Sequence, residues 1–312
     1  MGTADGKAGL MEHVRCNLCG ADDAVVLYPS TIEQRKSGDW RAFRCTHSGY
    51  GWHHTIVRCQ QCGLVYTDPR PDGHDIIETY QAVEDPLYLE EREGRVLTFE
   101  HHLKPLERRT GPPNGRALLD VGCYTGVFVE IAARHGWDAW GVEPSRWAVE
   151  HAQAQGLHVV QGTLETAGLP EAYFDVVTMW DVIEHLTNPR RAIQETYRLL
   201  KPGGLIVVHT IDIESPFARL MGHRWPWLME MHIYYFSRRT LRTMLERCGF
   251  QVLSDRPQGR YLRLGYLMNR VSALMPAVGR PAEWLVTRLG VRGAAVRVNL
   301  GDLFTAYAHR SA

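Results

Sequence analysis

The sequence predicts an α/β protein with a mostly parallel sheet, preceded by a small cysteine-rich module. Two observations lead to this fold class. Segments of strand and helix character alternate from residue 116 to residue 255, and two Cys-x-x-Cys-Gly motifs lie near the N-terminus. Strands that alternate with helices form parallel sheets with right-handed crossovers. The 312 residues are enough for one large domain or two modest ones.

The amino-acid composition limits which kinds of partner the protein can be expected to bind and in which cellular compartment we expect it. Lys+Arg and Asp+Glu both number 35, so the net charge is zero and a nucleic-acid partner is disfavoured. The chain has no run of 18 apolar residues, so we expect no transmembrane helix. The opening MGTADGKAGL lacks the apolar core of a secretory signal. We therefore expect a cytoplasmic protein, in which the seven cysteines remain reduced.

The two cysteine motifs predict a structural zinc site. CNLCG contains Cys16 and Cys19, and CQQCG contains Cys59 and Cys62. Four thiolates suit tetrahedral Zn²⁺ and leave no open position for catalysis. The alternatives are two unrelated cysteine pairs or a redox pair. The loop between the motifs offers substitute ligands, although a solvated loop is the simpler interpretation; these are Cys45, His47, His53 and His54.

A linker separates the cysteine module from the alternating region. TDPRPDGHD, at 67–75, is rich in turn residues, and 76–109 has a helical pattern that ends at the break TGPPNG. The helical segment could also cover the ligand of the next domain. The predicted boundaries are a zinc-binding module at 1–75, a helical linker or cap at 76–115 and the main domain at 116–312.

In the main domain, each predicted helix has a recognisable start or stop. Ser145 and Ser237 are N-cap residues, Asn188 followed by proline starts a helix, and Gly136 and Gly156 end helices. The predicted strands are 116–121, 137–143, 157–160, 173–180 and 204–210. In such sheets the ligand lies at the carboxyl ends of the strands, where the strand order reverses.

The stretch LLDVGCYTG, at 118–126, has the form of a nucleotide-binding turn. Asp120, Gly122 and Gly126 follow the first strand, and Glu143 ends the second. A carboxylate in that position can accept hydrogen bonds from both hydroxyls of a ribose. These features predict a ligand with a free ribose, either a dinucleotide or S-adenosylmethionine.

Tyr124 distinguishes between these two ligands. It occupies the second glycine position of the dinucleotide fingerprint G-x-G-x-x-G, where its side chain would crowd a pyrophosphate. S-adenosylmethionine has no phosphate, so a side chain costs less there. The loop therefore favours S-adenosylmethionine over the cofactor of a dehydrogenase.

Residues 116–255 resemble a class I S-adenosylmethionine-dependent methyltransferase. The matching segments are LLDVGCYTG, GVEPS, QGTLE, FDVVTMWDVIEHL, LLKPGGLIVV and HIYYFSRRTLRTMLERCGF. The resemblance implies that Gly122, Gly126 and Glu143 hold the cofactor, beside Asp120. The further cofactor positions that it implies are Gly162, Thr163 and Leu164 near the adenine, and Trp180 and Asp181 near the methionine part. Tyr124 departs from the usual glycine, and we expect its ring over the cofactor or the substrate entrance.

The resemblance also completes the fold, a Rossmann-like sheet with one antiparallel strand. FQVLSD and DLFTAYAHR would form the closing antiparallel pair, with residues 260–295 inserted between them as helices. Residues 256–312 contain nine arginines, no lysine and two acids, Glu283 and Asp302. The insertion could be a lid, an oligomer contact, or a peripheral surface for anionic lipid or a phosphorylated substrate. A plain helical extension is the alternative.

Two histidines are candidates for the catalytic base. Methyl transfer is an in-line displacement, in which a base can take a proton from the acceptor. His185 and His232 follow the fourth and fifth strands, and for each a structural role is an open alternative. Glu184 and Glu230 are weaker candidates, expected to be solvated. The aromatic residues Trp225, Trp227, Tyr234 and Tyr235 could line a substrate pocket or simply cap the sheet.

The resemblance thus implies methyl transfer from S-adenosylmethionine. The pairing of a zinc module with this domain resembles bacterial methyltransferases that modify sugars or secondary metabolites, which implies a small-molecule or sugar/glycan acceptor and C- or O-methylation. A nucleotide-sugar is one such acceptor. The alternative from another class is an inert cofactor-binding scaffold that recruits partners through the zinc module. An RNA methyltransferase is disfavoured by the neutral charge. The oligomeric state is left open.

Overall fold

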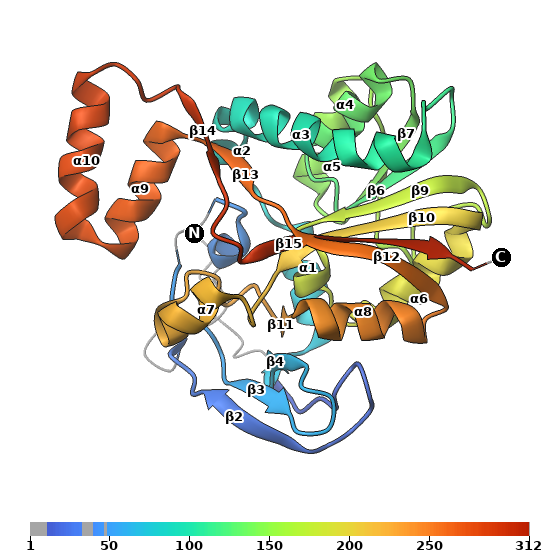
Figure 1. Cartoon of the computed structure of the whole chain (residues 1–312), viewed down its shortest axis with the longest axis horizontal. Helices are drawn as coiled ribbons and strands as arrows, with labels where there is room; N and C mark the ends of the chain where they lie inside the picture. Colours follow the sequence, from blue (N-terminus) through green and yellow to red (C-terminus); the bar gives the residue numbers. More distant parts are fainter. Residues whose placement is uncertain (1–10, 33–39, 47–48, 312) are drawn as a thin grey trace, which may run out of the picture.

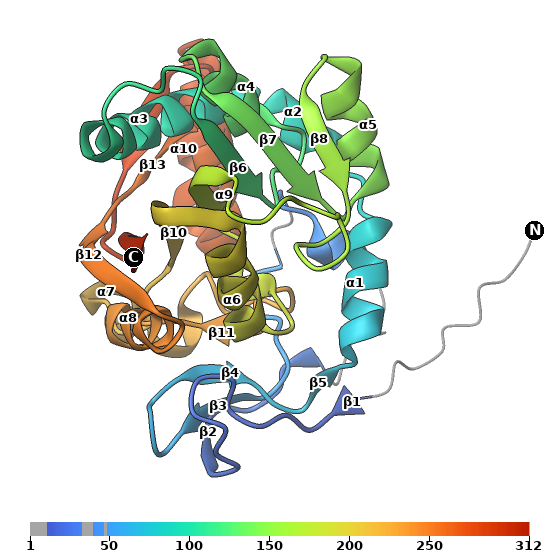
Figure 2. The same ribbon diagram turned by 90° about the vertical axis from the view of Figure 1, so that its right-hand side faces the viewer.

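A seven-stranded sheet forms the centre of the protein. The computed structural model describes residues 11–32, 40–46 and 49–311. The strand order is β12-β15-β10-β9-β6-β7-β8, and helices lie on both faces (Figures 1 and 2). The strands are β6 (Ala117–Val121), β7 (Asp138–Glu143), β8 (His158–Gln161), β9 (Phe174–Trp180), β10 (Leu200–Ile211), β12 (Phe250–Pro257) and β15 (Leu303–Arg310).

Strand directions confirm the predicted fold class. β6 pairs in parallel with β7 and β9, β7 with β8, and β9 with β10. β15 runs antiparallel to both β10 and β12, so it is the one antiparallel strand of the sheet. β10 begins at Leu200, earlier than predicted, and its register with β9 shifts between Leu200 and Leu205. A strand covered on both faces needs apolar residues at successive positions, and all five residues of β6 are buried.

The helices of this domain begin at the predicted caps. The Ser145 hydroxyl accepts a hydrogen bond from the Ala148 amide, and Ser237 forms a capping box with Thr240. Asn188 likewise caps the helix that starts at Pro189. The helices are α4 (Val127–Arg134), α5 (Arg146–Ala154), α6 (Pro189–Leu199), α7 (Pro216–Met221) and α8 (Arg238–Arg247), with short 3-10 turns η3 (Ile183–His185) and η4 (Gly222–Arg224).

The cysteine-rich module shares its sheet with the main domain. Its order is β11-β4-β3-β2, in which β11 comes from the region after β10 (Figure 1). The elements are β2 (Ala24–Tyr28), η2 (Trp40–Phe43), β3 (Ile56–Cys59), β4 (Val65–Thr67) and β11 (Tyr234–Tyr235); a separate pair is formed by β1 (Met11–Glu12) and β5 (Arg70–Pro71). The pairing of β4 with β11 was not predicted, since it joins segments far apart in the sequence.

Three helices connect the module to the central sheet. They are α1 (Gly73–Gln81), α2 (Pro86–Glu90) and α3 (Arg92–Thr110). α1 begins inside the predicted turn region, where the Asp72 carboxylate caps it by accepting a hydrogen bond from the His74 amide. α3 packs against α4. The predicted helical character of this segment is thus present.

The C-terminal insertion is a helical hairpin on a β-ribbon. Its elements are β13 (Arg260–Arg263), α9 (Leu264–Leu274), α10 (Pro276–Arg288) and β14 (Ala295–Val298). The helices were predicted, but the antiparallel β13–β14 pair was not. β13 packs against α3, and the hairpin projects from the body of the protein (Figure 1). In the described part of the chain, no helix is both long and apolar enough to cross a membrane.

Candidate active site and metal centre

The turn after β6 depends on its glycines. Gly122 has a φ of 64°, which lies in the left-handed region, and its amide donates a hydrogen bond to the Val142 carbonyl at 2.8 Å. A Cβ atom at Gly122 would lie 2.7 Å from Cγ2 of Val182. Gly126 has a φ of 76°, and a Cβ atom there would lie 2.6 Å from Cδ1 of Leu157. Both positions therefore require glycine for the turn to keep this shape.

Glu143 lies beside this turn with both carboxylate oxygens anchored. The Tyr124 amide donates to Oε2 at 3.0 Å, and the Ser145 amide donates to Oε1 at 2.9 Å. Burial raises the pKa of Glu143 to about 7, against the opposing effect of these two amides. Each oxygen has a second lone pair, so the fixed carboxylate can still accept hydrogen bonds from a diol.

One cavity brings together most of the predicted site residues. The predicted residues that line it are Gly122, Tyr124, Glu143, Gly162, Thr163, Leu164, Asp181 and His185. Gly126, Asp120, Trp180 and His232 lie outside its lining. Gly126 is the N-cap of α4, and Asp120 accepts a hydrogen bond from the Thr178 hydroxyl at 2.6 Å. Burial raises the pKa of Asp120 to about 8. Because its hydrogen bond with Thr178 joins β6 to β9, this side chain supports the strands behind the cavity.

Asp181 connects the cavity to the insertion. It has a positive φ of 55° at the end of β9, and its Oδ1 lies 3.1 Å from Nη2 of Arg260 in β13. Burial has the largest single effect and raises the pKa of Asp181, but Arg260 and, to a smaller extent, three nearby histidines together outweigh burial and lower that pKa. An ionised carboxylate therefore faces the cavity. Trp180, one residue earlier, packs beneath the loop against Phe128, with ring centroids 5.2 Å apart.

Tyr124 forms part of the cavity wall. Its φ is 48°, and its side chain is almost fully buried. The Tyr88 ring of α2 packs edge-on against it with centroids 4.4 Å apart, and the Arg95 guanidinium lies 3.5 Å from the Tyr88 ring centre. The helical linker thus holds the Tyr124 ring in place. This packing gives the bulky residue a defined position in a turn where glycine is usual.

Both candidate histidines are held with one ring nitrogen available as a base. Nδ1 of His185 lies 2.9 Å from the Met231 carbonyl, and Nδ1 of His232 lies 2.8 Å from the Trp227 carbonyl. A carbonyl only accepts, so the proton resides on Nδ1 in each ring and Nε2 carries the lone pair. Burial lowers the pKa of both, that of His232 to about 3, so both are neutral near pH 7.

The two histidines differ in access. His185 lines the cavity, and the Tyr80 hydroxyl of α1 lies 3.0 Å from its Nδ1. His232 lies behind it, outside the cavity lining, with ring centroids 4.8 Å apart. His185 is therefore the better placed of the two to meet a proton on a ligand in this cavity.

The expectation that Glu184 is solvated is wrong. Its side chain is 1% exposed and accepts a hydrogen bond from the Thr210 hydroxyl at 2.8 Å. Burial raises its pKa, and the Asp181 charge adds to this effect. The Glu184 carbonyl also accepts from the Ile233 amide, which ties η3 to the loop before β11. Glu230 is half-buried and does not line the cavity.

The aromatic segment after β10 packs as a cap. Trp225 and Trp227 both donate their indole N–H to Oδ2 of Asp302, at 3.1 and 2.9 Å. Tyr234 and Tyr235 are fully buried at the shared sheet of β4 and β11. None of these four residues lines the cavity. The structure therefore supports the hydrophobic-cap interpretation.

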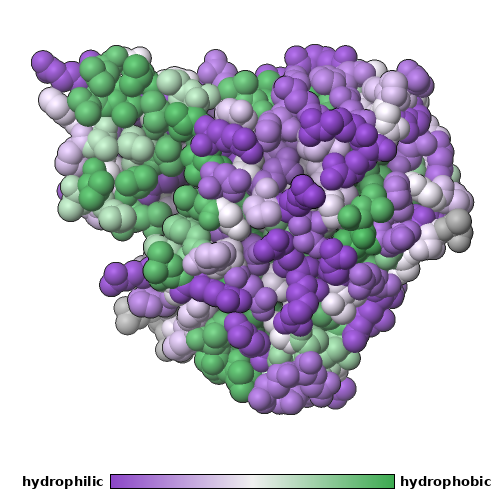
Figure 3. All heavy atoms as spheres, in the orientation of Figure 1, coloured by the Kyte–Doolittle hydropathy of each residue, from purple (hydrophilic) through white to green (hydrophobic). Residues whose placement is uncertain are grey.

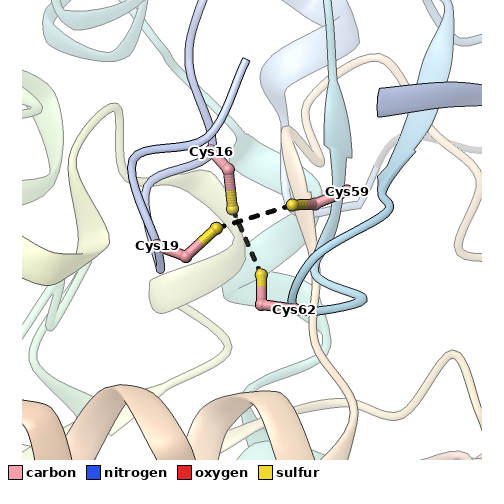
Figure 4. Close-up of side chains that lie close together, drawn as sticks. All are labelled: Cys16, Cys19, Cys59 and Cys62. Atoms are coloured by element: carbon pink, nitrogen blue, oxygen red, sulfur yellow. Dashed lines mark hydrogen bonds between the residues drawn. The ribbon is translucent and has the colours of Figure 1, made fainter. Parts of the chain in front are cut away.

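The four motif cysteines converge in one cluster (Figure 4). Their Sγ atoms all lie within 4.8 Å of one another; the shortest separations are 3.4 Å from Cys16 to Cys62 and 3.5 Å from Cys19 to Cys59. Zinc–sulfur bonds in a tetrahedral site imply sulfur atoms about 3.8 Å apart. The cluster therefore fits a tetrahedral metal ion without rearrangement of the backbone.

The substitute ligands proposed from sequence lie elsewhere. Cys45 lines the main cavity, and His53 hydrogen-bonds through Nδ1 with the His54 carbonyl. In the described parts of the chain, neither of these histidines belongs to a cluster of metal-binding side chains. His47 lies outside the described residues.

Comparison with known proteins identifies the family. The model of the methyltransferase domain family matches residues 88–255, which is more than half of the chain. The chain belongs to this methyltransferase family. The resemblance to class I S-adenosylmethionine-dependent methyltransferases is therefore confirmed. The match begins in α2, so it includes the helix α3 that precedes the predicted main domain.

Curated relatives of this methyltransferase match over the same region. The ubiquinone biosynthesis O-methyltransferase of Photorhabdus laumondii is 34% identical over 149 residues, which cover 44% of this chain and 60% of that protein. The enzyme of the same name from Klebsiella pneumoniae is 35% identical over 152 residues, covering 45% and 61%. This methyltransferase thus spans about 60% of the length of the curated relatives that it matches.

Solved structures resemble it more distantly. A SAM-dependent methyltransferase from Archaeoglobus fulgidus is 21% identical with a TM-score of 0.47, covering 72% of this chain and all of that one. Phosphoethanolamine N-methyltransferase 2 of Haemonchus contortus, in complex with S-adenosyl-L-methionine, is 15% identical with a TM-score of 0.45, covering 68% and 53%.

Sequence analysis allowed that the helical segment at 76–109 covers the ligand, but it did not identify which residues of the N-terminal region line the cavity of this methyltransferase. Phe43, Cys45, Ile76, Tyr80 and Val83 all line it. These residues belong to the cysteine module, to α1 and to the segment that follows. They form no spacing pattern with the glycine loop, so no sequence signal links them to it.

Proposed function

We propose that this protein transfers the methyl group of S-adenosylmethionine to a small-molecule acceptor. The observation that carries the proposal is the single cavity in which the glycine turn, Glu143 and a neutral histidine meet. Family membership supplies the reaction class. The geometry supports the proposal, because a carboxylate that could bind a diol and a histidine that could act as a base line the same cavity.

We assign the cofactor to the half of the cavity next to β6 and β7. Glu143 would accept the ribose hydroxyls through its remaining lone pairs, with Gly122 allowing close approach of the backbone. Gly162, Thr163 and Leu164 would contact the adenine, and the Asp181 carboxylate would face the amino group of the methionine part. Asp120, Gly126 and Trp180 support this half from behind, and Tyr124 walls it.

In the proposed reaction, the protein supplies a base and positions the reactants. S-adenosylmethionine, when bound, supplies an electrophilic methyl group on a sulfonium. His185 then takes the proton of the acceptor on Nε2, while the Met231 carbonyl holds the proton on Nδ1. His232, packed behind it, completes the positioning of that ring. The rest of the rate acceleration comes from alignment of the acceptor with the methyl group.

The curated relatives support a proposal for the acceptor class. Their printed name, ubiquinone biosynthesis O-methyltransferase, favours a hydroxyl acceptor over a carbon acceptor. A sugar or glycan hydroxyl, suggested by the pairing of a zinc module with this domain, is the second choice. A reducing, cytoplasmic setting belongs to the proposal, since all seven cysteines are free thiols in the structure.

The metal and domain assignments are also part of the proposal. Cys16, Cys19, Cys59 and Cys62 would hold a structural Zn²⁺, because four thiolates leave no coordination position for a substrate. The division into a zinc module at 1–75, a helical linker at 76–115 and a catalytic domain at 116–312 completes the assignment. The helical linker contributes Tyr80 and Val83 to the cavity.

Calorimetric titration of the metal-replete protein tests the cofactor assignment. We expect micromolar affinity for S-adenosylmethionine, no affinity for NAD, and at least tenfold weaker binding in Glu143→Ala, about 1.4 kcal/mol. Glu150→Ala, an exposed acid on α5, is the matched control and should bind like wild type. Equal binding by Glu143→Ala and wild type would overturn the assignment.

A second measurement separates catalysis from cofactor binding alone. S-adenosylhomocysteine production is followed with a panel of catechol-type phenols and sugar nucleotides. Turnover with a phenol supports O-methylation of a small aromatic acceptor. Tight cofactor binding without turnover on any acceptor would instead favour an inert scaffold that binds partners through the zinc module.

A further inference from the structure

The inner face of α10 is fully used for packing on α9. Gly279, Ala282, Glu283 and Val286 recur at the spacing of one helix face, and they are the least exposed residues of α10. A Cβ atom at Gly279 would lie 2.2 Å from the Ser272 amide nitrogen, so the two helices touch at backbone distance. The residues on the other faces of α10 are therefore not needed to hold the two helices of the hairpin together.

The solvent-exposed side of α10 carries large apolar side chains. Val278, Leu285 and Leu289 follow one another at intervals of seven and four residues, so they form one stripe along the helix. They are 55%, 49% and 64% exposed, and neighbouring Trp284 is 62% exposed. Figure 3 shows hydrophobic residues gathered over the projecting hairpin. An apolar face of this kind usually marks a contact surface.

Arginines border this apolar stripe. Arg280, Trp284 and Arg288 are spaced four residues apart, so they form a second row beside the first. The Arg288 guanidinium lies 5.5 Å from the centre of the Trp284 ring. The only acid of the insertion, Glu283, turns toward α9, where it accepts from the Ser272 hydroxyl and pairs with Arg292. The outward face is thus apolar and positively charged.

We propose that the outer face of the α9–α10 hairpin binds an anionic lipid surface. Helices that bind in the plane of a membrane surface carry tryptophan and leucine on one face and arginine beside them. α10 has 13 residues, about 20 Å in length, so it would lie in the headgroup region with its axis parallel to the membrane. This inference goes beyond the proposed function and concerns a surface outside the cavity.

Charge argues for lipid over a second copy of the chain. A two-fold contact places the same patch on both sides of the interface. The arginine row of one copy would then face an arginine row, and no acid on either outward face would compensate it. Anionic headgroups supply the missing negative charge, and acyl chains supply the apolar partner.

Vesicle co-sedimentation of the full-length, metal-replete protein tests this inference. We expect binding to vesicles of phosphatidylcholine with about a third phosphatidylglycerol, little binding to pure phosphatidylcholine, and weaker binding in about 0.5 M NaCl. The triple variant Trp284→Ser/Leu285→Ser/Leu289→Ser and the double variant Arg280→Gln/Arg288→Gln should each bind at least tenfold more weakly.

Matched controls keep the test specific. Val26→Ser removes an equally exposed apolar side chain from β2, and Arg256→Gln removes an exposed arginine from β12; both should bind like wild type. All variants should keep wild-type affinity for S-adenosylmethionine, which shows that they are folded. Absence of binding to the anionic vesicles would overturn the inference. So would a concentration-dependent dimer, seen by analytical ultracentrifugation, that the triple variant abolishes.

Discussion

The two sides of the cavity are built from different parts of the chain. The glycine-loop side, which contains Gly122 and Glu143, comes from consecutive strands and turns of one α/β unit. The histidine side, which contains His185 with His232 packed behind it, depends on Tyr80 of α1 and on the loop before β11. One side is local in sequence, and the other is assembled from three distant segments. We expect the two sides to respond differently to mutation.

Of all the changes, loss of a cysteine ligand should have the largest effect on activity, and it should disturb the histidine side of the cavity more than the glycine-loop side. Cys59→Ser removes one of four thiolates, and a structural zinc site contributes roughly 10 kcal/mol or more to folding. β3 and β4 support β11, so we expect loss of order in residues 229–236 and at least about a hundredfold loss of turnover. Zinc content and hydrogen exchange of that segment are the measurements.

Cys248→Ser is the matched control, because Cys248 lies outside the cluster. It should retain zinc and activity. If Cys59→Ser kept both zinc and normal exchange in 229–236, the dependence of the histidine side on the module would be disproved.

Replacement of the histidines should sharpen the distinction between binding and chemistry. We expect His185→Gln to lower kcat by about 10²–10⁴ with little change in cofactor affinity, since it removes the base and keeps a polar side chain. His232→Gln should cost less, because His232 does not line the cavity. Single-turnover kinetics and calorimetry measure the two quantities. A His185→Gln variant with normal kcat would exclude His185 as the base.

Crowding of the glycine loop should mainly weaken cofactor binding. In Gly122→Ala the new methyl group meets Val182 in a backbone conformation that L-residues disfavour, so we expect about tenfold weaker cofactor binding. Val182→Ala removes the clash but leaves the backbone strain, so the double variant should recover part of the affinity. A calorimetric double-mutant cycle measures this coupling. Additive losses would show that the contact is unimportant.

The smallest effect should be a pH dependence from Glu143. Its pKa rises on folding from an ordinary value of 4.5 to about 7. The stability that the protonated carboxyl contributes is therefore complete below about pH 4.5 and is lost as the pH rises through 7. Hydroxyl donors favour the ionised carboxylate, so cofactor affinity should increase a few-fold from pH 6 to pH 8. Calorimetry on Glu143→Gln should show a flat profile; the same slope in that variant would assign it to another group.

The difference between the glycine-loop side, which is local in sequence, and the histidine side, which is not, also explains which features the sequence could predict. The strands and caps around Gly122, Glu143 and Ser145 were predictable, because hydrophobic periodicity and capping are local signals. Glu184 was expected at the surface, since no local pattern shows that Thr210 would satisfy it in the interior. The pairs β4–β11 and β13–β14 were missed for a related reason: short strands pair through contacts that are distant in the chain.

The sheet formed by β11, β4, β3 and β2 also determines where the chain can be cut into fragments. A fragment starting at residue 76 would retain the whole matched methyltransferase region, yet it would lack β4, the partner of β11. The unpaired edge of Tyr234–Tyr235 would become a site for aggregation. Arg239 and Arg247 of α8, which donate to the carbonyls of Cys62 and Leu18, would lose those acceptors as well. We therefore expect the cysteine module to fold as one unit with the methyltransferase region, so expression or domain-swap experiments should transfer both parts together.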